Sequence, residues 1–279
     1  MPKKNSEINK RKLANHNRSR QKRRARGGRE RERERMEAMA TRSLRRRLVE
    51  FHLQASQHLQ LRPIVKYTSL SFFLDRFMPS LQRGSIAEKM QGGNCKSWLL
   101  EHLRESNLQL FVLISIWVSS KIHDSQPLSV RSLKALSDKI ISDQHFTSRD
   151  FSDAEFIFLE VIGYDIGTSK IAFRHLEDLF IQLRGLSKLG ETIEMETCMD
   201  IMDLLYEEDT SSLFLASFDS LAASILVSAY LISVPKQQWE FPLLPWVKFV
   251  TSHEEQDIMR FVGCILSHVS KAEEFRPQN

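Results

Sequence analysis

The feature that most constrains the fold is a helical pattern of apolar residues that begins after Thr41 and continues almost to the end of the 279-residue chain. Apolar residues recur every three or four positions, whereas the two-residue alternation typical of strands is scarce. The expected helices lie at 44–59, 63–77, 108–121, 127–141 and 150–163, and then at 171–183, 195–205, 220–232, 244–250 and 254–269. Five helices followed by five of similar length predict an all-α chain with two tandem five-helix domains.

Proline and glycine mark several of the expected helix ends. Pro63 suits the first turn of a helix, Pro79 should stop that helix, and Gly163 should end the helix that starts at 150. The helical pattern after Thr41 and its two series of five helices predict three regions. They are a basic tail over 1–41, an N-terminal helical domain over 42–168 and a C-terminal helical domain over 169–279.

The basic charge of the chain is confined to its N-terminal end. Residues 1–50 contain 19 Lys and Arg residues against 6 acidic ones, so the remainder carries −8 while the whole chain carries +5. Before Arg35 the large apolar residues are Ile8 and Leu13, and such a segment buries too little surface to offset its chain entropy. The sequence predicts a disordered tail.

Two basic clusters in this tail resemble a two-part nuclear import signal, because an acidic receptor groove binds extended Lys and Arg side chains. The clusters consist of Lys10, Arg11 and Lys12, followed by Lys22, Arg23, Arg24 and Arg26. The alternative is a solvated tail that adheres to nucleic acids. The import interpretation predicts an import receptor as partner and a nuclear location, with a cytoplasmic share left open.

Enzymatic and cofactor chemistry finds little support in the sequence. Gly27-Gly28 lies among charges without a preceding strand, and His253-Glu-Glu lacks the second histidine of a zinc helix, so we expect no catalytic residue, metal or other cofactor. The three cysteines are too far apart for a disulfide framework, which favours reduced, intracellular thiols. No apolar stretch is long enough to span a bilayer, so no membrane partner is expected.

Two charges stand on otherwise apolar helical faces. Lys121 follows Leu110, Leu113, Ile114 and Trp117 in helical steps, and Glu155 aligns with the apolar residues of its own helix. A lone charge on a face that excludes water is costly, so each should pair with the other or with a partner protein.

Each charge also has a simpler interpretation. Glu155 completes a capping-box pattern with Ser152, although Thr147 offers an earlier cap. Lys121 could face the C-terminal end of its helix dipole. These alternatives assign the two charges to local helix structure.

Several motifs together resemble the cyclin family. They are SLRRRLVEF at 43–51, LDRF at 74–77, SSKI at 119–122, DAEFIFLEVIGYDI at 153–166 and SLAASILVSAY at 220–230. The stretches 108–116 and 234–242 are most similar to the plant J-class cyclins. The resemblance covers about residues 42–270 and implies two tandem cyclin-box folds.

The resemblance also implies roles for individual residues. Arg45 and Asp75 would form an internal pair, and Leu110 belongs to the cyclin-box signature. Lys121 and Glu155 would flank a groove for the C-helix of a cyclin-dependent protein kinase. Ile122, Tyr164 and Ile166 would add apolar contacts around that pair.

The implied function is that of a regulatory subunit rather than an enzyme. It would activate the kinase by favouring the conformation in which the C-helix is correctly positioned, in the control of the cell cycle or a related process. A docking patch for substrates would comprise Leu44, Arg47, Leu48 and Phe51, although Arg47 places a charge where cyclins usually carry an aliphatic residue. The alternative is a cyclin-fold transcription adaptor of the general-initiation-factor type, but the body's net −8 argues against a broad surface for nucleic acid.

Overall fold

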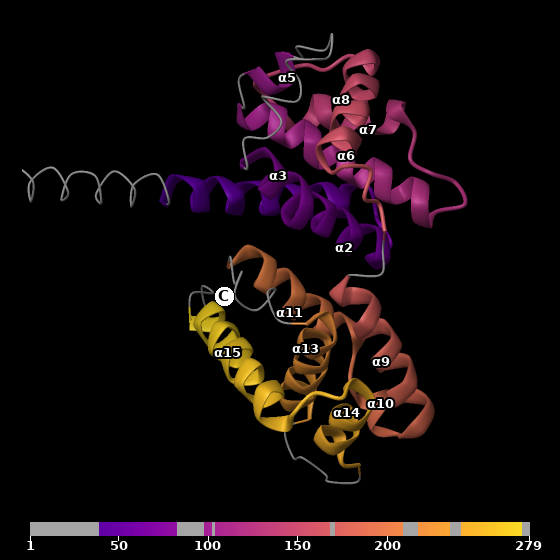
Figure 1. The fold of residues 1–279 in the computed structure, drawn as a ribbon, viewed down its shortest axis with the longest axis vertical. Helices are drawn as coiled ribbons and strands as arrows, with labels where there is room; N and C mark the ends of the chain where they lie inside the picture. Colours follow the sequence, from indigo (N-terminus) through magenta and orange to yellow (C-terminus); the bar gives the residue numbers. More distant parts are fainter. Residues whose placement is uncertain are drawn as a thin grey trace, which may run out of the picture. The chain divides into compact units, whose positions relative to one another are not determined.

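The computed structural model describes residues 39–82, 98–101, 104–167, 171–208, 217–234 and 241–274. The chain divides into two compact units, residues 1–45 and residues 46–279. In the first unit the described residues, 39–45, are helical, and both basic clusters lie outside the described residues. Every regular element described in the second unit is a helix, which confirms the all-α prediction (Figure 1).

The first set of helices in the second unit surrounds one central helix. One helix runs without interruption over 39–58, and residues 46–58 of it belong to this unit. The set continues with α2 (Pro63–Ser71), η1 (Phe72–Phe77), α3 (Met78–Gln82), α5 (Trp98–Glu101), α6 (Glu105–His123), α7 (Val130–Ile140) and α8 (Ser148–Val161). Helix α6 packs against α2, η1, α7 and α8, so it is buried on nearly all faces from Ser106 to Ser120. The expected one-sided apolar stripe is therefore replaced by a helix that is apolar all round, as a central helix should be. Even so, no helix in the described ranges has the length and apolar content needed to cross a membrane.

Pro79 does not end the helix that starts at Pro63, and the prediction of a stop there was wrong. The helical run continues to Gln82, because η1 is a π-helical segment immediately before α3. The Met78 N–H bonds to the Phe73 carbonyl, five residues back. This wider turn gives the proline ring room beside the preceding carbonyl groups.

The second set is arranged around α13. It comprises α9 (Ala172–Leu186), α10 (Leu189–Thr192), α11 (Met195–Glu207), α13 (Phe218–Ser233), α14 (Leu243–Thr251) and α15 (Glu255–Glu274). Helix α13 packs against α9, α11, α14 and α15. The five expected helices are present, and α10 is a short addition that the sequence pattern did not predict. The predicted boundary between 168 and 169 lies outside the described residues, so the division into two domains there stays a prediction.

Tyr67 on α2 joins the two sets of helices. Its ring stacks on Phe173 of α9 with 4.9 Å between centroids, and its hydroxyl donates to Asp203 of α11 over 2.9 Å. Lys66 contacts the other carboxylate oxygen of Asp203 at 2.6 Å. Burial raises the pKa of Tyr67 and also that of Asp203. Lys66, Tyr67 and Asp203 thus form a largely buried cluster between α2 and α11, in which each of the three polar side chains has a partner.

Candidate functional site

Lys121 and Glu155 lie in direct contact. The Lys121 Nζ is 2.5 Å from Oε1 of Glu155, and it also lies 3.6 Å from the centroid of the Trp117 ring. The Lys121 side chain is 38% exposed and that of Glu155 is 21% exposed. The structure thus places both predicted charges together where α6 emerges from the core, on a surface that remains accessible to a partner.

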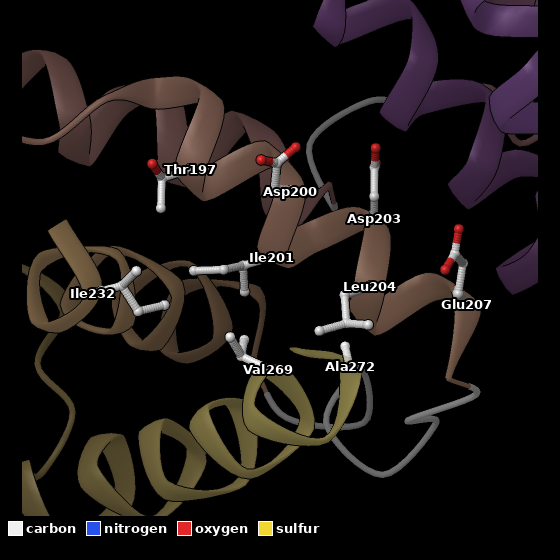
Figure 2. A pocket seen from close by; sticks show the side chains of 9 residues that line it. All are labelled: Thr197, Asp200, Ile201, Asp203, Leu204, Glu207, Ile232, Val269 and Ala272. Atoms are coloured by element: carbon white, nitrogen blue, oxygen red, sulfur yellow. The ribbon is translucent and has the colours of Figure 1, made fainter. Parts of the chain in front are cut away.

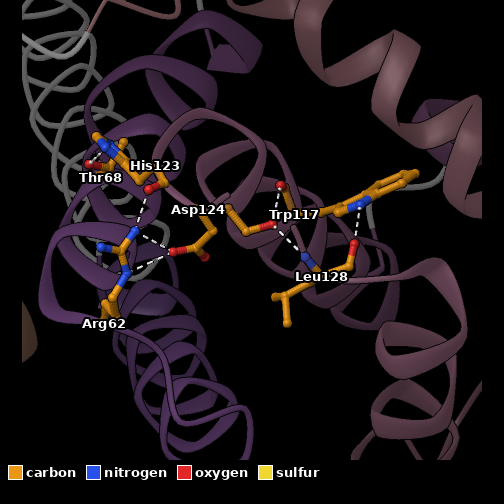
Figure 3. Close-up of polar contacts among 7 residues, drawn as sticks. Arg62, Thr68, Trp117, His123, Asp124 and Leu128 are labelled. Carbon is orange, nitrogen blue, oxygen red and sulfur yellow. Dashed lines mark hydrogen bonds and ion pairs between the residues drawn. The ribbon is translucent and has the colours of Figure 1, made fainter. Parts of the chain in front are cut away.

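Hydrogen bonds hold the end of α6 that carries Lys121 (Figure 3). The Trp117 indole N–H donates to the Leu128 carbonyl over 2.9 Å, and the Leu128 N–H donates to the Ser120 hydroxyl over 3.2 Å. Both bonds fix the segment after α6 against its last two turns. The indole ring beneath the Lys121 ammonium is therefore held in one orientation.

Arg62 and Thr68 secure the residues that follow Lys121 (Figure 3). Arg62 donates to Oδ1 of Asp124 and to the His123 carbonyl. The Thr68 hydroxyl lies 2.9 Å from Nε2 of His123. Burial, followed by the positive charge of Arg62, lowers the pKa of His123. The position of Lys121 is consequently set by contacts between α6 and the start of α2.

Helix α8 positions Glu155 through a cap at its N-terminus. Thr147 is the N-cap and forms a capping box with Asp150, whose N–H donates to the Thr147 hydroxyl over 3.2 Å. Glu155 lies two turns further along α8. The alternative in which Glu155 is the capping residue was therefore wrong, because the cap is formed earlier and the Glu155 carboxylate points to Lys121 instead.

The C-terminus of α8 is closed by a Schellman motif. The Tyr164 N–H donates to the Leu159 carbonyl over 2.8 Å, and the Gly163 N–H donates to the Glu160 carbonyl over 3.0 Å. Gly163 adopts φ 65°, which glycine tolerates without a Cβ penalty. Tyr164 also has a positive φ of 58°, a conformation that is uncommon for a residue with a bulky side chain. The predicted helix end at Gly163 is confirmed.

Arg76 anchors the segment after this motif, and the sequence analysis did not identify it. Its guanidinium donates to the Asp165 and Gly167 carbonyls, the latter over 2.6 Å, and lies 3.2 Å from the Asp165 carboxylate. The guanidinium also covers the Phe72 ring at 4.9 Å. Its position in the LDRF motif, beside Asp75, was the available signal. The periodicity of apolar residues could not indicate that Arg76 bonds to carbonyl groups about 90 residues further along the chain.

Four large apolar side chains next to these elements are exposed. Ile122 follows Lys121, Phe156 follows Glu155, and Tyr164 and Ile166 lie on the segment that Arg76 holds; their exposed fractions are 37, 55, 59 and 44%. Three of them were predicted as apolar contacts for a partner, and Phe156 was missed because it falls outside the buried stripe of α8. We call Lys121, Glu155 and these four residues the Lys121–Glu155 surface.

The other predicted residues are placed as follows. Leu110 is buried in α6, Arg45 ends the first unit and Asp75 lies in η1 of the second, so the Arg45–Asp75 pair stays a prediction. Leu48 and Phe51 of the suggested docking patch are buried, 1 and 6% exposed, because they belong to the core. Neither offers an exposed apolar surface. Leu44 belongs to the first unit and is partly exposed.

Arg47, the charged member of that patch, has an acidic partner. Its guanidinium forms two hydrogen bonds with Glu105, at 2.8 and 3.0 Å. The side chain that interrupts the expected patch is thus part of a bidentate ion pair with the first turn of α6.

The chemistry available at the Lys121–Glu155 surface is recognition. An ammonium can donate to peptide carbonyl groups, and a carboxylate can accept from peptide N–H groups, while the exposed apolar side chains supply contact area. A helix end carries such unpaired backbone groups. Among the described residues, no group of three or more His, Cys, Asp or Glu side chains is arranged to hold a metal ion.

Comparison with known proteins adds independent findings. The family described as "Cyclin, N-terminal domain" matches residues 15–167. The chain is 57% identical to "Cyclin-J18-like" of Oryza sativa subsp. japonica over 84% of this chain and 90% of that protein. It is 56% identical to "Cyclin-J18" of Arabidopsis thaliana over 81% of this chain and 94% of that protein. A crystal structure of a viral cyclin from herpesvirus saimiri has a similar fold, with a TM-score of 0.57 and 18% identity over 83% of this chain and 85% of that one.

Proposed function

The chain belongs to the cyclin family and resembles its plant J-class members, and from this we propose that it binds and activates a cyclin-dependent protein kinase. The Lys121–Glu155 surface would receive the C-helix of the kinase. The chain would act as a regulatory subunit without catalysis of its own, in the control of cell division or a related process. The observation that carries this proposal is the Lys121–Glu155 pair at 2.5 Å with exposed apolar side chains beside both residues.

The geometry supports recognition of a helix by its backbone. Lys121 and Glu155 are joined to each other in the free subunit, and an incoming helix would replace part of that bond with bonds to its own carbonyl and N–H groups. Because the end of α6 and both ends of α8 are fixed, little ordering entropy is lost at these two residues on binding. Activation would follow if the bound conformation of the kinase were the active one, since the subunit then shifts the population towards it.

Binding to a panel of purified plant cyclin-dependent kinases tests this proposal. We expect Lys121→Ala, Glu155→Ala and Phe156→Ala to lose kinase binding and the stimulation of peptide phosphorylation, while their thermal melts stay close to that of the unsubstituted protein. Lys139→Ala on α7 and Glu191→Ala on α10 are matched controls, because both residues are exposed and lie on other elements. Unchanged binding by the first three variants would refute the assignment, and unfolding of both charge variants would make the pair structural.

We further propose that the basic clusters at 10–12 and 22–26 direct nuclear import. A fluorescent fusion that lacks residues 1–35 should spread into the cytoplasm, whereas the full chain should concentrate in the nucleus. Replacement of the Lys and Arg residues of both clusters by Gln should have the same effect as the deletion. A nuclear signal that is unchanged by both alterations would exclude this role.

A further inference from the structure

A groove of about 440 Å³ lies between α11, the end of α13 and the last turns of α15. One side of it is apolar. Figure 2 shows Ile201 and Leu204 pointing from α11 towards Ile232 of α13 and towards Val269 and Ala272 of α15. Ile232 is 40% exposed although it is a large aliphatic residue. The volume lies within the range of pockets that hold ligands, about 300–1,000 Å³, and is large enough for apolar side chains of a peptide.

The other side of the groove is acidic. Asp200, Asp203 and Glu207 follow one another at single-turn intervals along α11 and line the groove next to its apolar residues (Figure 2). Asp203 is already bound by Lys66 and Tyr67. None of the described residues forms an ion pair or a hydrogen bond with the carboxylates of Asp200 or Glu207.

Glu207 is the more unusual of these two carboxylates. It is half-buried, and its pKa is raised by burial first and then by the negative charges of Asp203 and Glu50. Arg46 opposes this shift but is itself paired with Glu50 at 3.0 Å. A partly buried carboxylate among like charges, without a cation of its own, is suited to accept a cation from outside.

We propose that this groove binds an amphipathic, basic helix of a partner protein. Leucine-like side chains of that helix would lie on Ile201, Leu204, Ile232 and Val269, and two arginine or lysine side chains would reach Asp200 and Glu207. The two carboxylates are seven residues apart, about 10 Å along α11, so basic residues seven apart on the partner match them. Long basic side chains can extend across α11 with their methylene groups on apolar surface. This site is separate from the Lys121–Glu155 surface and does not depend on the proposed kinase binding.

Fluorescence anisotropy with designed helical peptides tests the proposal. The probe is a labelled peptide with leucine at helical spacing along one face and two arginines seven residues apart. One control peptide has glutamate in place of both arginines, and a second has glutamine in place of the leucines. We expect saturable binding of the probe and much weaker binding of both control peptides.

Protein variants identify the groove as the binding site. Asp200→Asn combined with Glu207→Gln should weaken probe binding about fivefold to tenfold, as expected for two partly exposed ion pairs. Asp143→Asn combined with Glu191→Gln makes the same change in net charge on exposed residues outside the groove and should leave binding unchanged. Ile232→Ser should weaken binding of the probe. This variant should still bind the probe more tightly than the glutamate peptide. Glu207→Arg should bind the glutamate peptide more tightly than the unsubstituted protein does.

Two results would overturn the proposal. One is equal affinity of the probe for the Asp200/Glu207 variant and for the unsubstituted protein, which would mean that the peptide binds elsewhere. The other is concentration-dependent dimerisation in sedimentation experiments that Ile232→Ser abolishes, which would make a second copy of this chain the occupant. Thermal melts of every variant show whether it is folded, so that a loss of binding can be distinguished from unfolding.

Discussion

The ammonium of Lys121 contacts the carboxylate of Glu155 at 2.5 Å, although 34 residues separate them in the chain. This bond joins the last turn of α6 to the middle of α8. Both side chains remain partly exposed, so water screens their attraction. The pair is therefore positioned by the fold, and the fold does not depend strongly on the pair.

Replacing Lys121 by Met should lower the free energy of unfolding by no more than about 1 kcal/mol, the usual range for exposed ion pairs and cation–π contacts. Methionine keeps most of the aliphatic stem on Trp117. Urea unfolding of Lys121→Met, Glu155→Gln and the double variant gives the coupling energy directly. A loss of 3 kcal/mol or more, about the cost of breaking a buried pair, would contradict this expectation.

Arg76→Lys should release the segment 165–167 from η1. A lysine ammonium cannot reproduce the fork that contacts two carbonyl groups and a carboxylate, so we expect a loss of about 1.5–3 kcal/mol in stability. Amide hydrogen exchange at Ile166 and Gly167 should accelerate with it. Arg149→Lys on α8 is the control, because Arg149 is highly exposed and its ion pair with Asp153 is long, 3.8 Å.

Tyr67→Phe should destabilise the contact between α2 and α11. It removes a hydroxyl that lies 2.9 Å from Asp203 and 3.0 Å from the Met199 carbonyl, and it leaves a partly buried carboxylate with Lys66 alone. We expect a loss of about 1–3 kcal/mol in urea unfolding. Tyr164→Phe should change stability little, since the Tyr164 side chain is exposed. Equal effects of the two substitutions would show that the Tyr67 hydroxyl contributes nothing specific.

Stability should fall as the pH decreases below about 6.5, because His52 is buried in its neutral form. Burial, and to a smaller degree the charge of Lys66, lowers its pKa to about 3, and its ring nitrogens lie 2.6 Å from the Ser69 hydroxyl and 3.3 Å from that of Ser56. Between pH 6.5 and 3 the unfolded chain therefore binds a proton that the folded chain does not. His52 should contribute a loss of about 2 kcal/mol between pH 7 and pH 5.

The His52→Gln variant isolates that contribution. Its unfolding free energy should depend less on pH than that of the unsubstituted protein over the same interval, whatever its stability at pH 7. Asp203 and Glu207 have raised pKa values and therefore stabilise the folded protein as the pH falls, which is the opposite of the effect of His52. Both carboxyl groups are present in both proteins. Parallel pH profiles of the two proteins would contradict a buried, neutral His52.

Most helices could be predicted from the sequence because their signals are local. Thr147 caps α8, Gly163 ends it, and Pro63 opens α2, and each of these effects depends on a few neighbouring residues. Pro79 shows the limit of such signals. Whether a proline stops a helix depends on the turn before it, and the π-helical turn of η1 is formed in the packed core.

The candidate site could be predicted only in part. Lys121, Glu155 and the apolar residues next to them were found from helical spacing and from the resemblance to cyclins. Arg76 and Phe156 were not, because one bonds to carbonyl groups far along the chain and the other is defined by its exposure. The groove beside α11 has no local signature at all, since three helices from separate parts of the sequence form it.

The sequence alone determined the all-α class, several helix ends such as Pro63 and Gly163, and the positions of the two charges, because backbone propensity, capping and apolar period act over a few residues. The tertiary structure decided what those charges do. Lys121 leaves the core beside Glu155 because α6 is surrounded by other helices up to Ser120 and α8 packs along its end. Burial and long-range contact are properties of packed surfaces, which no local pattern of residues specifies.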